Sequence, residues 1–255
     1  MPHIPGSLRS LLANLIDYAG LYPPANLPLP IAVERYQCFL ASPESWILNR
    51  LVLPAARLHE VPLGQRWRIT LLVDREPGPL PPQVETLESR GVHPFSLPTY
   101  CEVSLDAIEG CFAKIRTGGL TPDAIPSSVT VAQFLSAAAE RRIPFKATAG
   151  LHHPLRSRHA LTYAADSPQA PVHGFLNVFV AAVFAWNGLG PEALHEILEE
   201  TSAGAFDFQD DQLCWRREAL TTAQVAAGRR DFAHSFGSCS FEEPVSGLRE
   251  LGLLP

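Results

Sequence analysis

The segment that most constrains the fold of this chain runs from residue 113 to residue 149. Ala113–Thr117 and Ile143–Ala149 are short, mainly apolar runs with the length of a strand. Between them, Ser128–Arg142 places its larger apolar residues at helical spacing along one face. A strand, a helix and a second strand in this order form a right-handed unit with two parallel strands. The chain is therefore expected to contain a parallel sheet covered by helices.

The rest of the chain repeats this alternation of short apolar runs and helical patterns. Further strands are expected at Arg50–Pro54, Arg66–Asp74 and Val92–Leu97. Helices are expected at Ile31–Leu40, Pro82–Arg90, Phe175–Trp186, Pro191–Glu200, Thr222–Ala233 and Pro244–Leu251, with Leu11–Ala19 as either a helix or a strand. Two features interrupt the pattern, an aperiodic segment at His152–His173 and a β-hairpin at residues 206–215.

These elements predict a single α/β domain over residues 1–255. It is expected to fold as an irregular (β/α)8 barrel of the TIM type, with the long loop and the hairpin inserted. An open doubly wound sheet is the alternative. No G-x-G-x-x-G motif follows the first expected strand, which removes the usual reason to prefer a dinucleotide-binding sheet. No cofactor is expected.

Composition and charge limit the classes of partner that this chain is expected to bind. The chain is 46% hydrophobic and 18% charged, so it can bury a large core. Its net charge of −6 and the lack of a basic block argue against a nucleic-acid or anionic-membrane surface. The most apolar run, Phe175–Trp186, is too short to span a bilayer. Five cysteines without a C-x-x-C pair, and no signal peptide, predict a reduced, cytoplasmic protein.

Two lysines carry the main functional signal. Lys114 and Lys146 are the only lysines among 20 basic residues, and each lies in one of the two strands of the expected strand–helix–strand unit. Side chains alternate along a strand, so both amines are expected to face the barrel lumen near the carboxyl ends of adjacent strands. Burial and the second cation are expected to lower the pKa of each amine. A neutral amine can attack a carbonyl and form a Schiff base.

Other polar residues complete the expected site. Asp17 and Asp74 each end an apolar run, from where a carboxylate can act as a general base or proton shuttle. The Gly118-Gly119 turn and Gly150 expose N–H groups that can hold a phosphate or carboxylate. The expected substrate-binding residues are Arg116, Thr117, Gly118, Gly119, Thr148, Gly150, His152, His153, His173, Gly237, Ser238 and Ser240.

Four short motifs resemble the deoxyribose-phosphate aldolases. Lys114-Ile115-Arg116-Thr117-Gly118 is similar to the K-T-S-T-G motif of that family, and Phe145-Lys146-Ala147-Thr148-Ala149-Gly150-Leu151 to its F-K-x-A-G-G-I-R motif. Phe236-Gly237-Ser238-Cys239-Ser240 resembles the phosphate loop F-G-A-S-S, and Leu15-Ile16-Asp17-Tyr18 the opening L-I-D. The resemblance implies a class I aldolase barrel. Lys114 would then form the Schiff base, Lys146 would lower its pKa, and Asp17 would belong to the proton relay.

The main prediction is therefore a Schiff-base lyase acting on a small aldehyde or ketone, with or without a phosphate. One alternative is a metal-assisted hydrolase or isomerase, with ligands drawn from His152, His153, His173, Glu242 and Glu243. Another is a barrel that binds a metabolite without catalysis, its lysines serving as ion-paired residues at strand ends. Cys239 has no identifiable partner in the sequence. Whether the chain forms a homo-oligomer is left open.

Overall fold

The computed structural model describes residues 3–92 and 95–255, and its centre is a closed barrel of parallel strands. The strands follow one another around the barrel in the order β1-β13-β7-β6-β5-β4-β3-β2. Their bounds are β1 Ile16–Tyr18, β2 Leu48–Pro54, β3 Ile69–Leu72, β4 Val84–Ser89, β5 Thr99–Cys101, β6 Phe112–Arg116, β7 Phe145–Thr148 and β13 Ala233–Ser238. The prediction of a TIM-type barrel is confirmed.

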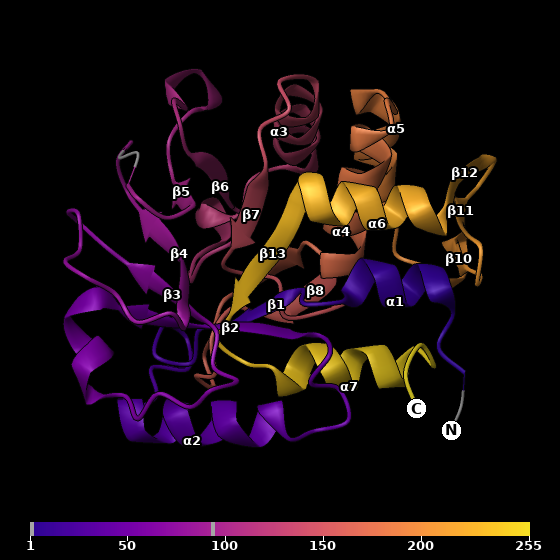
Figure 1. The fold of residues 1–255 in the computed structure, drawn as a ribbon. Coiled ribbons are helices and arrows are strands. Elements are labelled where there is room, and N and C mark those ends of the chain that lie inside the picture. Colours follow the sequence, from indigo (N-terminus) through magenta and orange to yellow (C-terminus); the bar gives the residue numbers. More distant parts are fainter. Residues whose placement is uncertain (1–2, 93–94) are drawn as a thin grey trace.

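Helices cover the barrel unevenly (Figure 1). They are α1 Gly6–Leu12, α2 Leu29–Leu40, α3 Ser128–Glu140, α4 Phe175–Trp186, α5 Pro191–Glu199, α6 Thr222–Asp231 and α7 Glu242–Glu250. Among the described residues from β2 to β6, the connections contain only two short 3-10 turns, Ala55–Glu60 and Leu105–Ala107. These short connections allow six barrel strands to fit within the first 116 residues of the chain.

The predicted strand–helix–strand unit is present as β6, α3 and β7. Ser127 caps α3, since its hydroxyl accepts a hydrogen bond from the Thr130 backbone N–H. Ala113 and Ala147 are fully buried on the helix-facing side of the two strands. Lys114 and Lys146 therefore take the opposite side, and the register places them directly beside each other. The facing predicted from strand alternation is confirmed for this pair.

The predicted helix at residues 175–186 is α4, and it forms the centre of the helical layer. It packs against α3, α5, α6 and β13, and Phe179 stacks on Phe145 and lies tilted against Phe236. Asn177 is fully buried there with its amide satisfied. Its Nδ2 donates to the carbonyls of Ile197 and Glu200 at 2.8 Å each, and its Oδ1 accepts from the Arg156 N–H at 2.9 Å. None of the helices in the described residues has the length and apolarity needed to cross a bilayer.

Two sequence expectations for the uncovered side of the barrel need correction. The helix expected at Pro82–Arg90 is wrong, because residues 84–89 form strand β4. Its Thr86 points inward and shares a hydrogen bond of 2.8 Å with Thr70 of β3, so pairing inside the barrel determines the local structure. Of the strand expected at Val92–Leu97, residues 93–94 lie outside the described residues. The next described strand is β5, which begins at Thr99.

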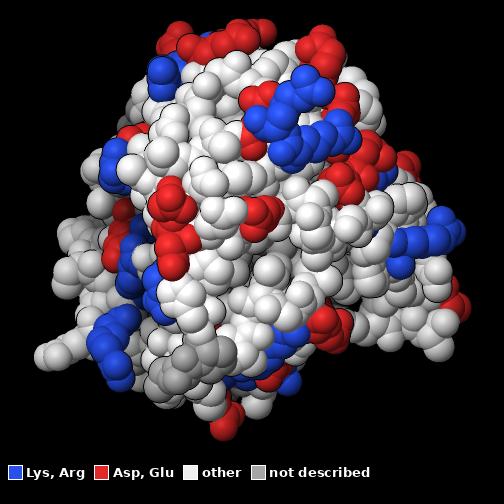
Figure 2. Space-filling view, turned by 90° about the vertical axis from the view of Figure 1, so that its right-hand side faces the viewer, with Lys and Arg blue, Asp and Glu red and all other residues white. Residues whose placement is uncertain are grey.

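The two insertions are more regular than expected. The aperiodic segment 152–173 contains an antiparallel pair, β8 Ser157–Ala160 and β9 Gln169–Val172. The predicted hairpin is confirmed as β10 Phe206–Phe208 and β11 Gln212–Trp215, with a third strand, β12 Glu218–Thr221, added to it. On the face in Figure 2, basic and acidic side chains are interspersed among wide uncharged areas.

Candidate functional site

The centre of the site is a row of alternating charges inside the barrel. Lys146 Nζ lies 2.5 Å from Asp17 Oδ2 and 2.5 Å from Glu88 Oε1. The other oxygen of the same glutamate, Oε2, lies 2.8 Å from Lys114 Nζ. Lys114 Nζ is also 3.4 Å from Glu102 Oε2. We refer to Asp17, Lys146, Glu88, Lys114 and Glu102, in this order, as the charge row.

Hydrogen bonds from uncharged donors fix Asp17, which lies at the inner end of the charge row. Asp17 is 1% exposed and accepts from Asn49 Nδ2 at 2.7 Å, from the Arg50 N–H at 3.2 Å and from Ser235 Oγ at 2.8 Å. A buried carboxylate that accepts from this many donors is held in one position. Strand β1 thus supplies an anion held by β2 and β13, as well as by Lys146 of β7.

The expected lowering of the Lys146 pKa is wrong. Burial alone would lower that pKa, but Asp17 and Glu88 outweigh burial and hold it above its usual range. Burial alone would likewise raise the pKa of Glu88, but Lys146 and Lys114 bring it to about 2. The repulsion expected between the two amines is replaced by attraction, because a shared carboxylate lies between them.

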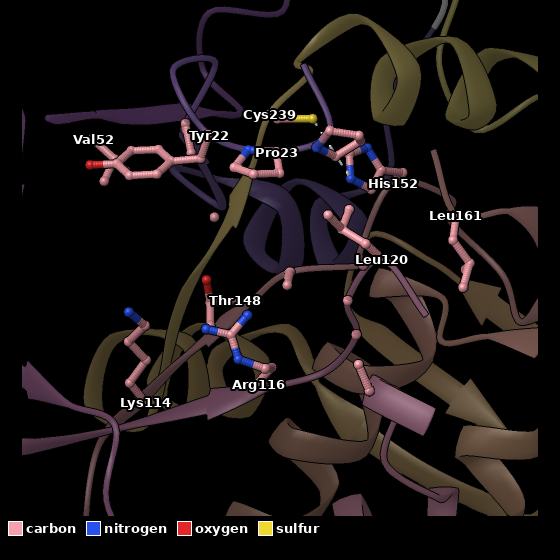
Figure 3. Close-up of a pocket in the computed structure, with 18 of the residues that line it drawn as sticks. Tyr22, Pro23, Val52, Lys114, Arg116, Leu120, Thr148, His152, Leu161 and Cys239 are labelled. Atoms are coloured by element: carbon pink, nitrogen blue, oxygen red, sulfur yellow. Dashed lines mark hydrogen bonds between the residues drawn. The ribbon is translucent and has the colours of Figure 1, made fainter. Parts of the chain in front are cut away.

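The two lysines differ in access to a large cavity. The Lys146 side chain is 1% exposed and, like Asp17, lies beneath the cavity floor, whereas Lys114 is 8% exposed and lines the cavity. The cavity has a volume of about 960 Å³. Arg116, Thr148 and Lys114 lie together at one end of it (Figure 3). This end is formed by the carboxyl ends of β6 and β7, where ligands bind in barrel enzymes.

Two glycine segments form the adjoining wall of the cavity. Gly118, Gly119 and Gly150 all line it. Gly118 and Gly150 pack backbone to backbone, since a Cβ on Gly118 would lie 2.8 Å from Gly150 Cα. Gly150 also has a φ of +81°, which favours glycine. Within the described chain the N–H groups of these three residues donate no hydrogen bond, so they remain available to a ligand.

Arg116 and Thr117 take different roles from each other. Arg116 lines the cavity and donates from Nε and Nη2 to Glu102, at 3.0 and 3.3 Å. Thr117 is 1% exposed and does not line the cavity, contrary to expectation. Its hydroxyl donates to the Ala149 carbonyl at 2.7 Å and therefore joins the two glycine segments to each other.

The three histidines expected to bind substrate do not lie together. His152 and His153 line the cavity, with His152 Nδ1 2.7 Å from Glu243 Oε2 and His153 stacked on His159. His173 is fully buried elsewhere, where its Nε2 donates to the Pro126 carbonyl at 2.8 Å. The three histidines therefore do not form one ligand set. Among the described residues, no group of three or more His, Cys, Asp or Glu is placed to hold a metal ion.

The three residues expected to form a phosphate loop also differ in whether they reach the cavity. Gly237 lines the cavity, but Ser238 and Ser240 do not. Ser238 Oγ accepts the Ser240 N–H at 3.3 Å, and Ser240 Oγ accepts the Glu243 N–H at 3.1 Å. Both hydroxyls therefore shape the entry into α7. Asp74 lines the cavity but is exposed, whereas Asp17 is buried.

Sequence reasoning missed three residues of the site. Glu88 falls within the helix expected at Pro82–Arg90, although the β-branched residues Val84 and Thr86 of that segment also suit a strand. Glu102 follows β5, the strand whose predicted position was wrong. Tyr22 lies in the proline-rich loop after β1. It lines the cavity, and its buried hydroxyl has no hydrogen-bond partner in the described chain.

Together these features define a parallel barrel with a buried lysine–carboxylate site at the carboxyl ends of its strands. No protein-family model matches the chain, and neither a curated protein nor a solved structure matches it significantly.

Proposed function

We propose that the protein is a lyase that forms a Schiff base between Lys114 and a small carbonyl substrate. One observation carries the proposal. Of the chain's two lysines, only Lys114 presents its amine to the cavity, and this amine contacts both Glu88 and Glu102. Lys146 is enclosed between Asp17 and Glu88 beneath the floor and serves to fix the charge row.

The carboxylates beside Lys114 supply the proton transfers. Glu88 is a weak base because its pKa is held at about 2, so Glu102 is assigned the proton from Lys114 Nζ. The neutral amine attacks the carbonyl carbon and forms a carbinolamine. Glu102 then returns the proton to the departing hydroxyl, water leaves, and a protonated imine remains. In the cleavage step, a C–C bond breaks toward the imine while Glu102 accepts the substrate's hydroxyl proton.

The charge row also favours the intermediate. The protonated imine restores the positive charge that the neutral amine lacks, so its nitrogen is attracted to Glu88, whose Oε2 lies 2.8 Å from Nζ. Glu88 cannot move away to a different partner, because its second oxygen is held by Lys146 at 2.5 Å. The role of Lys146 in this proposal is thus positioning, in place of the pKa lowering that the family resemblance implies.

The cavity walls define the class of substrate. The unbonded N–H groups of Gly118, Gly119 and Gly150 provide donors for a phosphate or carboxylate near Lys114. Leu120 and Leu161 line the other side and suit an apolar portion (Figure 3). We place the activity in the cytoplasm, where five free thiols stay reduced.

Reductive trapping tests the proposal. The protein is mixed with a panel of phosphorylated, carboxylated and neutral hydroxyaldehydes and ketones, then reduced with borohydride. The expected result is a stable mass increase on the peptide that contains Lys114. Lys114→Arg keeps the cation without a usable nucleophile, and it should give no adduct while remaining folded. A panel that leaves Lys114 unmodified, or an adduct found on Lys146 alone, would refute it. Ligand binding that survives without any adduct would favour the non-catalytic alternative.

A further inference from the structure

A second group of reactive side chains lies in the same cavity, away from Lys114 (Figure 3). Cys239 Sγ lies 3.9 Å from His152 Nε2, and His152 Nδ1 lies 2.7 Å from Glu243 Oε2. Cys239 directly follows β13, His152 lies in the segment after β7, and Glu243 lies in the first turn of α7. All three line the cavity. The structure thus provides the partner that the sequence does not reveal for Cys239.

This arrangement has the features of an activated nucleophile. A thiol contacts one nitrogen of an imidazole, and a carboxylate orients the imidazole through its other nitrogen. The carboxylate is itself held, because the Tyr163 hydroxyl donates to Glu243 Oε1 at 2.8 Å. Burial alone would lower the pKa of His152, but Cys239 and Glu243 raise it to about 9. A protonated imidazole beside a thiol stabilises the thiolate, which is the reactive form.

We propose that Cys239, His152 and Glu243 form an acyl-transfer site in which Cys239 Sγ is the nucleophile. The thiolate attacks the acyl carbon of an ester, and the C–O bond to the leaving group breaks. The departing alcohol takes the proton from His152 Nε2, which leaves a thioester on Cys239. Water then attacks the thioester carbon, gives one proton to His152, and releases the carboxylic acid and the thiolate.

The lining of the cavity near this triad indicates the kind of acyl group. Leu161 and Val172, from the β8–β9 hairpin, are both nearly buried and line the cavity together with Leu120. These side chains favour an apolar acyl chain over a charged one. The site uses a different nucleophile from the Lys114 site, and so it does not depend on the proposed lyase function.

Acetylation by 4-nitrophenyl acetate tests the proposal in the full chain. The wild type should release a burst of about one equivalent of nitrophenolate and carry one acetyl group on the Cys239 peptide. Cys239→Ser should abolish this burst, and His152→Asn should slow it roughly 100-fold. Glu243→Gln should slow it about 10-fold, since the imidazole loses its orienting partner. Glu242→Gln is the matched control, because Glu242 adjoins Glu243 in sequence but its Oε2 lies 3.7 Å from Arg35 Nη1 on the surface. This variant should give an unchanged burst.

A second measurement needs no variant and so does not depend on how the variants fold. Alkylation of the wild type by iodoacetamide is followed at each cysteine by peptide mass. Cys38 is exposed whereas Cys239 is only 5% exposed, so access alone would make Cys38 the faster. Activation by His152 should instead make Cys239 at least about 10-fold faster at neutral pH. The proposal is overturned if Cys38 reacts as fast as Cys239, or if the burst persists in Cys239→Ser.

Discussion

Replacing Lys146 with methionine distinguishes the structural role of Lys146 in the charge row from the chemical role of Lys114. The methionine side chain is apolar and of comparable length, so the change removes the ammonium with little loss of packing. Glu88 would keep its contact with Lys114 at 2.8 Å. Asp17 would keep only uncharged hydrogen-bond donors, because Lys146 is the one charged group among the described residues that hydrogen-bonds to it. The variant therefore leaves one buried carboxylate without an ion-pair partner in direct contact.

The size of the effect follows from this count of partners. Breaking a buried ion pair by removing one member costs about 3–5 kcal/mol in the free energy of unfolding, so we expect a loss of that order in Lys146→Met. Lys114→Met should cost less, about 1–2 kcal/mol. In that variant Glu88 keeps Lys146 at 2.5 Å and Glu102 keeps Arg116 at 3.0 Å. Adding Asp17→Asn to Lys146→Met should recover at least half of the loss, because the orphaned charge disappears.

Denaturant unfolding at neutral pH, followed by circular dichroism, measures these differences as shifts in the unfolding midpoint at constant slope. The role given to Lys146 is refuted if Lys114→Met is as destabilising as Lys146→Met. It is also refuted if Asp17→Asn gives no recovery in the Lys146→Met background.

Two further predictions concern the pH dependence and the glycine wall. The pKa of Glu88 is lowered from 4.5 to about 2, so its contribution to stability is present above pH 4.5 and is lost as the pH falls toward 2. Unfolding free energies measured over this range should decline in the wild type and decline less steeply in Glu88→Gln; equal slopes would contradict this. Gly118→Ala should cost about 1–3 kcal/mol, since its Cβ would meet Gly150 Cα at 2.8 Å. Gly78→Ala is the control, because a Cβ there meets nothing within 4 Å; equal unfolding midpoints for the two variants would contradict the close approach.

The part of the site that is local in sequence could be predicted. Lys114 and Lys146 face the lumen because side chains alternate along a strand, and the β6–α3–β7 unit has clear strand and helix patterns. Strand alternation therefore placed both amines correctly. The predicted change in the Lys146 pKa nevertheless had the wrong sign, because no carboxylate was expected between the two amines.

The missing carboxylate depends on contacts that are distant in sequence. Glu88 lies on β4, and the described residues of the connections on either side of this strand contain no helix, so no alternation of strand and helix marks it in the chain. Its inward direction is fixed by β3 and β5 on either side. In the same way, Cys239 and His152 meet only because β13 closes the barrel beside β7. Residue types alone do not reveal such pairs, because the residues come together only when the barrel closes.

The proposed chemistry depends on a difference between the two amines: Lys114 offers its own to the cavity, while Lys146 is enclosed by Asp17 and Glu88. Limited reductive methylation of the folded protein by formaldehyde, with the two lysine peptides quantified by mass, measures this difference. We expect Lys114 to be methylated while Lys146 stays unmodified until the protein unfolds. Methylation of Lys146 at the same rate as Lys114, or ahead of it, would contradict the proposed division of roles.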